Sequence, residues 1–188
     1  LLDPGKKPHE NKLFLLTLAA VIKAVDDNAE LLRLSASSPG NDHRLGANEA
    51  PPAIISIFLG EQLEDIIEQI IRGDVSSSIQ GEKLDTGVHV LPVLKKDATD
   101  RNRTSPFAFT GNKFEFRMLG SSMSISGPNF TLNTMVADVL QDFADELEQE
   151  DDFDSAVDAL IKKTVTEHQR IIFNGDGYSN EWVEEAER

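Results

Sequence analysis

Cysteine is missing from this 188-residue sequence, and its absence excludes several kinds of site. Structural disulfides, thiolate zinc sites and cysteine nucleophiles all require that residue. Positive charge is scarce as well, because 18 lysine and arginine residues stand against 33 acidic residues and the formal net charge is −15. Bulk electrostatics of this sign disfavour binding to nucleic acid and to anionic membranes. We therefore expect neither nucleic acid nor membrane among the partners.

Long hydrophobic runs are also missing. The most apolar run, Leu13 to Val25, is interrupted by Thr17 and Lys23 and is too short to cross a bilayer. No secretory signal is visible, and a chain without cysteine is compatible with a reducing compartment, so we expect a cytoplasmic protein. The sequence lacks an initiator methionine and stops at Arg188 within an expected helix, which favours a piece of a longer protein.

Hydrophobic periodicity predicts both helices and strands. An apolar helix is expected over about His9–Leu34, followed by a loop over Ser35–Pro52, and Glu61–Arg72 is predicted as an amphipathic helix that ends at Gly73. The other expected elements are a buried strand at Ala53–Leu59, a weak strand at Val88–Leu94, a serine-rich loop at Gly120–Gly127, a helix at Pro128–Glu150 whose apolar stripe includes Phe130 and Leu140, a helix at Phe153–Phe173 and a short helix near Glu181.

The stretch Asp100–Arg117 carries the most informative pattern. Phenylalanines alternate on both sides of Gly111-Asn112, which predicts a hairpin whose second strand points Phe114 and Phe116 to one face. Its other face carries Lys113, Glu115 and Arg117. A carboxylate between cations suits a site for a metal and an anionic substrate. It also suits an exposed strand with offsetting charges, and the alternation alone favours that interpretation.

The stretch Asp138–Asp154 holds nine carboxylates and no cation. This pattern is more typical of a solvated surface than of a metal buffer. The common phosphate-loop, dinucleotide, zinc-protease and serine-hydrolase motifs are not found in the sequence. Asn174–Glu185 superficially resembles a calcium loop, but Ser179 stands where that loop needs glycine, so we exclude it.

Several motifs in order along the chain resemble those of glutamine synthetases, especially the large type III branch of bacteria. The resemblance covers essentially the whole chain and implies an α+β fold: a portion of the catalytic domain, with antiparallel strands packed against long helices, and a helical C-terminal region. It divides the chain into residues 1–127, with an insertion near 61–99, and residues 128–188. The motifs are Arg44-Leu45-Gly46, Asn48-Glu49-Ala50-Pro51, Arg101-Asn102-Arg103-Thr104 and Phe114-Glu115-Phe116-Arg117.

The family resemblance implies ATP-dependent ligation of ammonia to L-glutamate through γ-glutamyl phosphate, with Mg²⁺ or Mn²⁺ and with ATP as co-substrate. By the same resemblance, Arg44 and Arg117 hold substrate, and Arg117 also steadies the phosphoryl oxygens. Glu49 closes the site and takes a proton from ammonium, Arg103 contacts the nucleotide phosphates and the transferring phosphoryl group, and Glu115 is a metal ligand. Lys113, expected near the nucleotide, stands where shorter classes carry arginine, and a further arginine of those classes is absent near Ala108.

The resemblance also implies a large ring-shaped homo-oligomer. Because the family's other metal-binding glutamates and its ATP segment lie upstream of these motifs, we expect the isolated chain to be inactive. Two alternatives stay open at this point. One is a γ-glutamyl-amine ligase of the same superfamily, and the other is a non-catalytic acidic helical interaction module.

Overall fold

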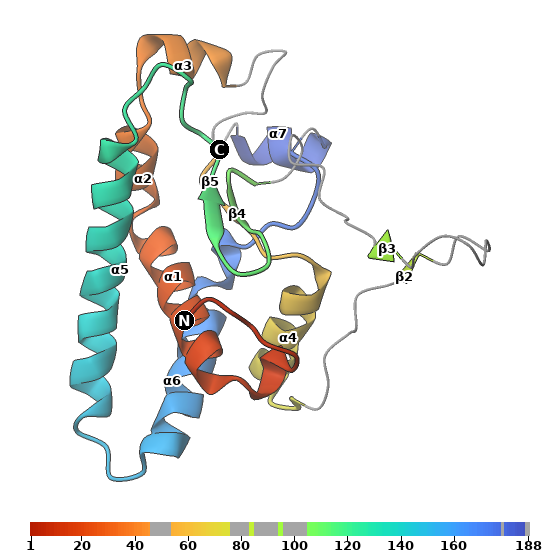
Figure 1. Ribbon diagram of the computed structural model, residues 1–188, viewed down its shortest axis with the longest axis vertical. Helices are drawn as coiled ribbons and strands as arrows, with labels where there is room; N and C mark the ends of the chain where they lie inside the picture. Colours follow the sequence, from red (N-terminus) through yellow and green to blue (C-terminus); the bar gives the residue numbers. More distant parts are fainter. Residues whose placement is uncertain (46–53, 76–82, 85–93, 96–104, 178, 187–188) are drawn as a thin grey trace.

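A computed structural model describes residues 1–45, 54–75, 83–84, 94–95, 105–177 and 179–186. Three long helices lie side by side and hold most of the core, while a small sheet packs beside them (Figure 1). The helices are α1 (Lys12–Asp27), α2 (Ala29–Ser35), α3 (Pro39–Arg44), α4 (Glu61–Arg72), α5 (Ser126–Leu147), α6 (Phe153–His168) and α7 (Asn180–Ala186), with 3-10 turns η1 (Pro8–Glu10) and η2 (Gln169–Ile171).

Helix α1 is the centre of the core. It packs against both α5 and α6, and Phe14, Leu18 and Ile22 are fully buried. The helix begins at Lys12 because the Asn11 side chain accepts a hydrogen bond from the Phe14 N–H. The nearly continuous apolar surface of α1 therefore reflects burial on several sides, as the sequence predicts.

The single helix expected over His9–Leu34 is wrong in its length. Asn28 separates α1 from α2, because its side-chain amide donates to the Ala24 carbonyl and its backbone leaves the helical conformation with φ −121° and ψ 24°. Asparagine competes in this way with the helical backbone. The break places Asp26 and Asp27 at a helix end rather than within a helix.

The sheet of three strands is mixed rather than antiparallel throughout. Strand β4 (Phe107–Phe109) pairs antiparallel with β5 (Phe114–Phe116), which confirms the predicted hairpin, and parallel with β1 (Ile57–Phe58). A bridge from Ile172 continues the sheet beyond β1. A second antiparallel pair joins β2 (Lys83–Leu84) and β3 (Leu94–Lys95), whereas residues 88–93 of the predicted strand Val88–Leu94 lie outside the described residues.

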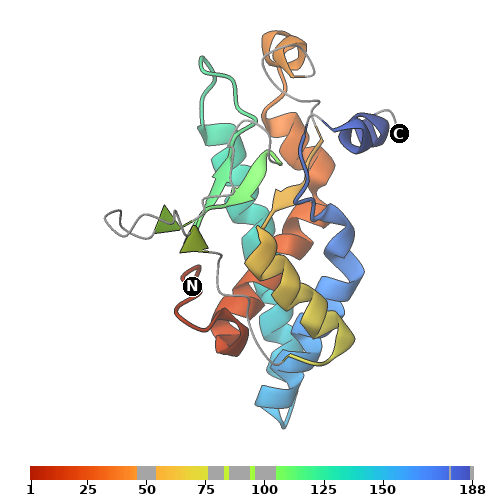
Figure 2. The same cartoon turned by 90° about the vertical axis from the view of Figure 1, so that its right-hand side faces the viewer.

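The remaining helix boundaries follow local chemistry. Helix α4 has the predicted bounds, and Gly73 ends it with φ +84°, a backbone conformation that favours glycine. Helix α5 begins two residues earlier than predicted, and the exposed Phe130 and Leu140 lie off its buried stripe. Helix α6 ends at His168 instead of Phe173, since the chain then turns through η2 to reach β1 (Figure 2). Among the described residues, no helix has both the length and the apolarity needed to cross a membrane.

Candidate functional site

Strand β5 carries the predicted row of charges. The Glu115 carboxylate lies at its centre, with Arg117 Nε 3.2 Å from one oxygen and Lys113 Nζ 3.7 Å from the other. The Thr110 hydroxyl donates to Glu115 at 3.2 Å. The side chain of Glu115 is 24% exposed and that of Lys113 is 64% exposed. A hydroxyl and two cations thus orient a half-buried carboxylate, which is more order than a fully exposed strand face provides.

The aromatic face of the hairpin fixes this row. Phe107 stacks on Phe114 with ring centroids 4.7 Å apart and meets Phe116 edge-on at 6.3 Å. Phe109 also contacts Phe14 of α1 at 5.9 Å, so the hairpin is attached to the helical core. Phe114 and Phe116 are half-buried and pack against the core. The strand is held through this face, because aromatic contacts of this geometry stabilise a sheet beyond the area that they bury.

The structure brings Arg44 to the end of β5. Arg44 donates through Nε and Nη2 to the Asn41 side-chain oxygen at 3.1 and 3.0 Å, and Nη2 also donates to the Met118 carbonyl at 3.1 Å. Met118 directly follows Arg117. Arg44 therefore lies beside the backbone that directly follows Arg117, although the two arginines are far apart in the sequence.

Helix α3 is the element that positions Arg44, and sequence reasoning missed it by expecting a loop over Ser35–Pro52. The signal was present, because Ser38 caps the Asn41 N–H and Pro39 occupies the first turn. Asn41 itself is buried and donates to the carbonyls of Ala36 and Met118 at 2.7 and 3.0 Å. Its amide thus joins α3 to the end of β5.

An ion pair holds the same helix from outside. The Arg33 guanidinium donates to the Asp42 carboxylate at 2.7 Å, and the Ser37 hydroxyl adds a bond at 3.0 Å. These two contacts, the arginine first, lower the pKa of Asp42 below its ordinary value. Asp42 therefore stays ionised near neutral pH and keeps α3 attached to α2.

Two predicted site residues, Glu49 and Arg103, lie outside the described residues. The structure does show how the chain resumes after Arg103. Ser105 is fully buried, where its hydroxyl accepts from the Ser56 hydroxyl and donates to the Phe173 carbonyl, both at 2.8 Å. This short chain of hydrogen bonds anchors the start of β4 to β1 and to the segment after η2.

The donor set on β5 fits a hard divalent ion only in part. Glu115 offers carboxylate oxygens, the ligand type that Mg²⁺ and Mn²⁺ prefer, and a carboxylate has about four acceptor positions. Magnesium takes about six oxygens in octahedral geometry. Glu115 can therefore be one ligand of such an ion, with the others coming from elsewhere.

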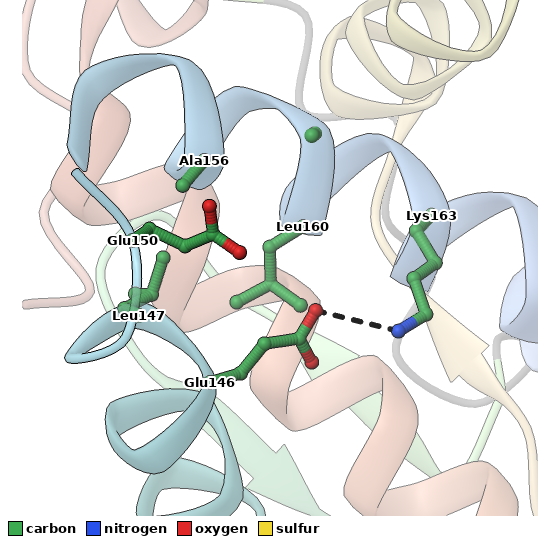
Figure 3. A pocket seen from close by; sticks show the side chains of 7 residues that line it. Glu146, Leu147, Glu150, Ala156, Leu160 and Lys163 are labelled. Carbon is green, nitrogen blue, oxygen red and sulfur yellow. Dashed lines mark hydrogen bonds and ion pairs between the residues drawn. The ribbon is translucent and has the colours of Figure 1, made fainter. Parts of the chain in front are cut away.

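The acidic stretch Asp138–Asp154 forms the end of α5, the turn and the start of α6. Lysines outside the stretch pair with it: Lys163 lies 3.4 Å from Glu146, and Lys12 lies 3.7 Å from Asp154. A shallow hollow at the turn has Leu147 and Leu160 in its lining, with Glu146 and Lys163 on one side of it (Figure 3). Some of the acidic charge thus serves contacts between helices, which weakens the argument for a separate interaction module.

Comparison with known proteins gives the same family as the motifs. The family model described as the glutamine synthetase C-terminal domain matches residues 156–188. The type-3 glutamine synthetase of Dictyostelium discoideum is 52% identical over 189 residues, which cover 99% of this chain and 26% of that protein. A glutamine synthetase of Bacteroides fragilis (strain YCH46) is 46% identical over 195 residues, covering 100% of this chain and 27% of the relative.

A glutamine synthetase of Butyrivibrio fibrisolvens is 47% identical over 193 residues, with 99% of this chain and 27% of the relative covered. The chain spans about a quarter of the length of the curated relatives that it matches. Its small mixed sheet packed with long helices agrees with the α+β fold expected of such a segment. The chain therefore belongs to the glutamine synthetase family, as a segment of an enzyme of the type-3 kind.

Proposed function

We propose that this chain supplies a portion of the active site of an enzyme that joins ammonia to L-glutamate at the expense of ATP, through γ-glutamyl phosphate. One observation carries the proposal. The Arg44 guanidinium contacts the carbonyl of Met118, the residue after Arg117, at the end of the strand that presents Glu115. Two arginines and one carboxylate at a single strand end are suited to an anionic substrate and a metal-bound phosphate.

The chemistry of these side chains matches phosphoryl transfer, which depends on positioning and charge neutralisation more than on covalent help. Nε and Nη2 of Arg44 are used by Asn41 and Met118, which fixes the plane of the guanidinium. Its Nη1 makes no hydrogen bond with the described residues and is available to a glutamate carboxylate. Arg117, which directly precedes Met118, holds the phosphoryl oxygens.

The remaining roles rest on the family motif. Glu49 takes a proton from ammonium, Arg103 contacts the nucleotide phosphates and the transferring phosphoryl group, and Lys113 lies near the nucleotide. Glu115 is one ligand of Mg²⁺ or Mn²⁺, an ion that would neutralise charge on the phosphates when bound. We further propose a cytoplasmic, ring-shaped homo-oligomer, and a division of the chain into a catalytic region of residues 1–127 and a helical region of residues 128–188.

The test is ADP release by the intact enzyme, measured with glutamate and ammonium supplied together and separately. We expect full turnover only with both substrates, and we expect no glutamate-dependent turnover from the isolated 188-residue chain. If a larger amine supports turnover and ammonium does not, the enzyme is a γ-glutamyl-amine ligase. If glutamate has no effect on ADP release, the proposed function is wrong.

A second measurement assigns Glu49. In the intact enzyme, Glu49→Ala should reduce glutamine formation by about 10²- to 10⁴-fold, the range typical of a missing general base. Formation of the acyl phosphate, followed with hydroxylamine as a trapping nucleophile, should fall much less. An equal loss in both steps would show that Glu49 has another role.

A further inference from the structure

A second group of charged side chains lies away from the β5 row, where two helices end. Asp26 and Asp27 are the last two residues of α1, and His168 is the last residue of α6. The Asp26 side chain is 5% exposed and that of His168 is 11% exposed, so both are nearly buried. The side chain of Asp27 is 41% exposed and reaches solvent. None of these residues has a role in the function proposed above.

The donor atoms of this group converge. His168 Nδ1 lies 2.8 Å from an Asp26 oxygen and 3.6 Å from an Asp27 oxygen, and the three ligand atoms all lie within 4.8 Å of one another. Ligands at the usual 2.0–2.2 Å from a zinc-like ion are roughly 3–3.5 Å apart, as tetrahedral or octahedral geometry requires. Side-chain adjustments of less than about 1.5 Å therefore bring all three atoms into a coordination sphere.

The group is also open on one side. A hollow of about 570 Å³ lies beside it, with Asp26, Asp27, Glu30 and Arg170 in its lining. The hollow gives an ion a route to the two carboxylates and leaves space for the water molecules that complete its coordination. The negative end of the α1 dipole lies at the same place, which adds to the attraction for a cation.

Two protein cations already contact the carboxylates. Arg170 Nε lies 2.9 and 3.1 Å from the two oxygens of Asp26, and Lys23 Nζ lies 2.7 Å from Asp27 Oδ2. A carboxylate has about four acceptor positions, so the contacts with Arg170 and Lys23 leave others open. His168 Nδ1 and Asp26 Oδ2 share a hydrogen bond at 2.8 Å, so an ion bound between them replaces that proton, which leaves to solvent. Arg170 and Lys23 also orient the carboxylates, as hydrogen-bond partners of metal ligands do. Their positive charge weakens the binding of a further cation.

We propose that Asp26, Asp27 and His168 bind a divalent transition-metal ion of the Zn²⁺ and Co²⁺ class, which joins the end of α1 to the end of α6. The imidazole nitrogen selects such ions, because Mg²⁺ prefers oxygen ligands alone. The site is separate from Glu115 on β5. Its existence does not depend on the catalytic proposal, and that proposal does not depend on it.

The test is a titration of the 188-residue chain with Co²⁺, followed by its visible absorption, and with Zn²⁺ by calorimetry. His168→Gln should weaken binding at least about tenfold. Losing a residue that only hydrogen-bonds a metal ligand already costs about that much, and His168 would be a ligand itself. The matched control is His43→Gln, which changes an exposed histidine on α3 and should leave binding unchanged. Excess Mg²⁺ should not displace Co²⁺.

Arg170→Gln gives a result of opposite sign. Removing its charge should tighten Co²⁺ binding severalfold if a metal shares Asp26 with it. If the group consists of ion pairs alone, wild type and every variant will show no saturable binding, and the proposal is then wrong. Because His168 is nearly buried, Asp27→Asn serves as a second ligand variant on the exposed side and should also weaken binding. Equal affinities of wild type and both ligand variants would likewise overturn the proposal.

Discussion

Glu115 on β5 lies between a lysine and an arginine, and Asp26 at the end of α1 lies between a histidine and an arginine, yet their surroundings differ. Glu115 is 24% exposed, and its neighbours Lys113 and Arg117 come from the same strand. Asp26 is 5% exposed, and its partners His168 and Arg170 come from a region of the chain more than 140 residues away.

This difference separates two roles for the same chemistry. The contacts of Glu115 with Lys113 and Arg117 lie within one hairpin, so those two contacts join no second element and can be exchanged for a ligand. A buried carboxylate whose partners come from another helix joins two elements, and removing its charge leaves those partners without a counter-charge. The comparison predicts that Glu115 matters mainly for binding, whereas Asp26 matters mainly for stability.

The largest effect is expected for metal binding by Glu115. In the intact enzyme, Glu115→Gln keeps the shape of the side chain and removes the charge that a divalent ion needs. Affinity for Mg²⁺ or Mn²⁺ should therefore fall at least about 10- to 100-fold. The free energy of unfolding in chelator should change by no more than about 1 kcal/mol, because a glutamine oxygen can still accept from Thr110 or Arg117 and the pair with the exposed Lys113 contributes little. Unchanged metal affinity with a lower chelator melt would make Glu115 a structural charge.

The matching change at the helix ends is Asp26→Asn, measured in chelator. We expect the free energy of unfolding to fall by about 1–3 kcal/mol, since His168 loses a charged partner in a nearly buried place. The measurement is urea denaturation of the 188-residue chain. Asp142→Asn, which changes an exposed carboxylate on α5, is the control and should have no measurable effect. Equal losses for Asp26→Asn and the control would remove the distinction drawn above.

A third variant tests whether Asn41 positions Arg44 for binding glutamate. Asn41→Ala removes the acceptor of Arg44 and the donor to Met118 and Ala36. Stability should fall by about 1–2 kcal/mol, and in the intact enzyme the KM for glutamate should rise more than kcat falls. Asn41→Asp restores the acceptor for Arg44 and should recover some of the loss in KM. If KM stays at the wild-type value in Asn41→Ala, Arg44 does not bind glutamate.

The smallest effect concerns Asp152, a carboxylate held by donors without charge. The Ser155 hydroxyl and then its backbone N–H lower the pKa of Asp152 below the ordinary value of 3.8. Its stabilising contribution is therefore present above that value and is lost as the pH falls through the lower folded-state pKa. Below about pH 4, stability should decline more steeply in wild type than in Asp152→Asn, which keeps an acceptor for the cap and does not titrate. Parallel declines in urea denaturation would contradict this.

Local patterns predicted the elements whose signals lie within a few residues. Helix α4 with its terminal glycine and the β4–β5 hairpin are the clearest cases, as are Lys113, Glu115 and Arg117 on one face. Three features needed tertiary information: the parallel pairing of β1 with β4, the contact of Arg44 with the end of β5, and the partners of Asp26. In each case the contacting residues are distant in sequence, and the residue pattern of neither segment predicts the contact.

The segment that follows η2 has a consequence for how the molecule folds. Phe173 donates to the Ile57 carbonyl at 2.9 Å, its own carbonyl accepts from Ser105, and the Asn174 side chain accepts from the N–H groups of Leu59 and Gly60 at 2.8 Å. The segment that covers the outer edge of β1 is therefore synthesised more than 100 residues after the strand itself. Such distant pairing slows folding and leaves an unpaired edge exposed in the meantime. A chain released before Phe173 would keep that edge and be prone to aggregate.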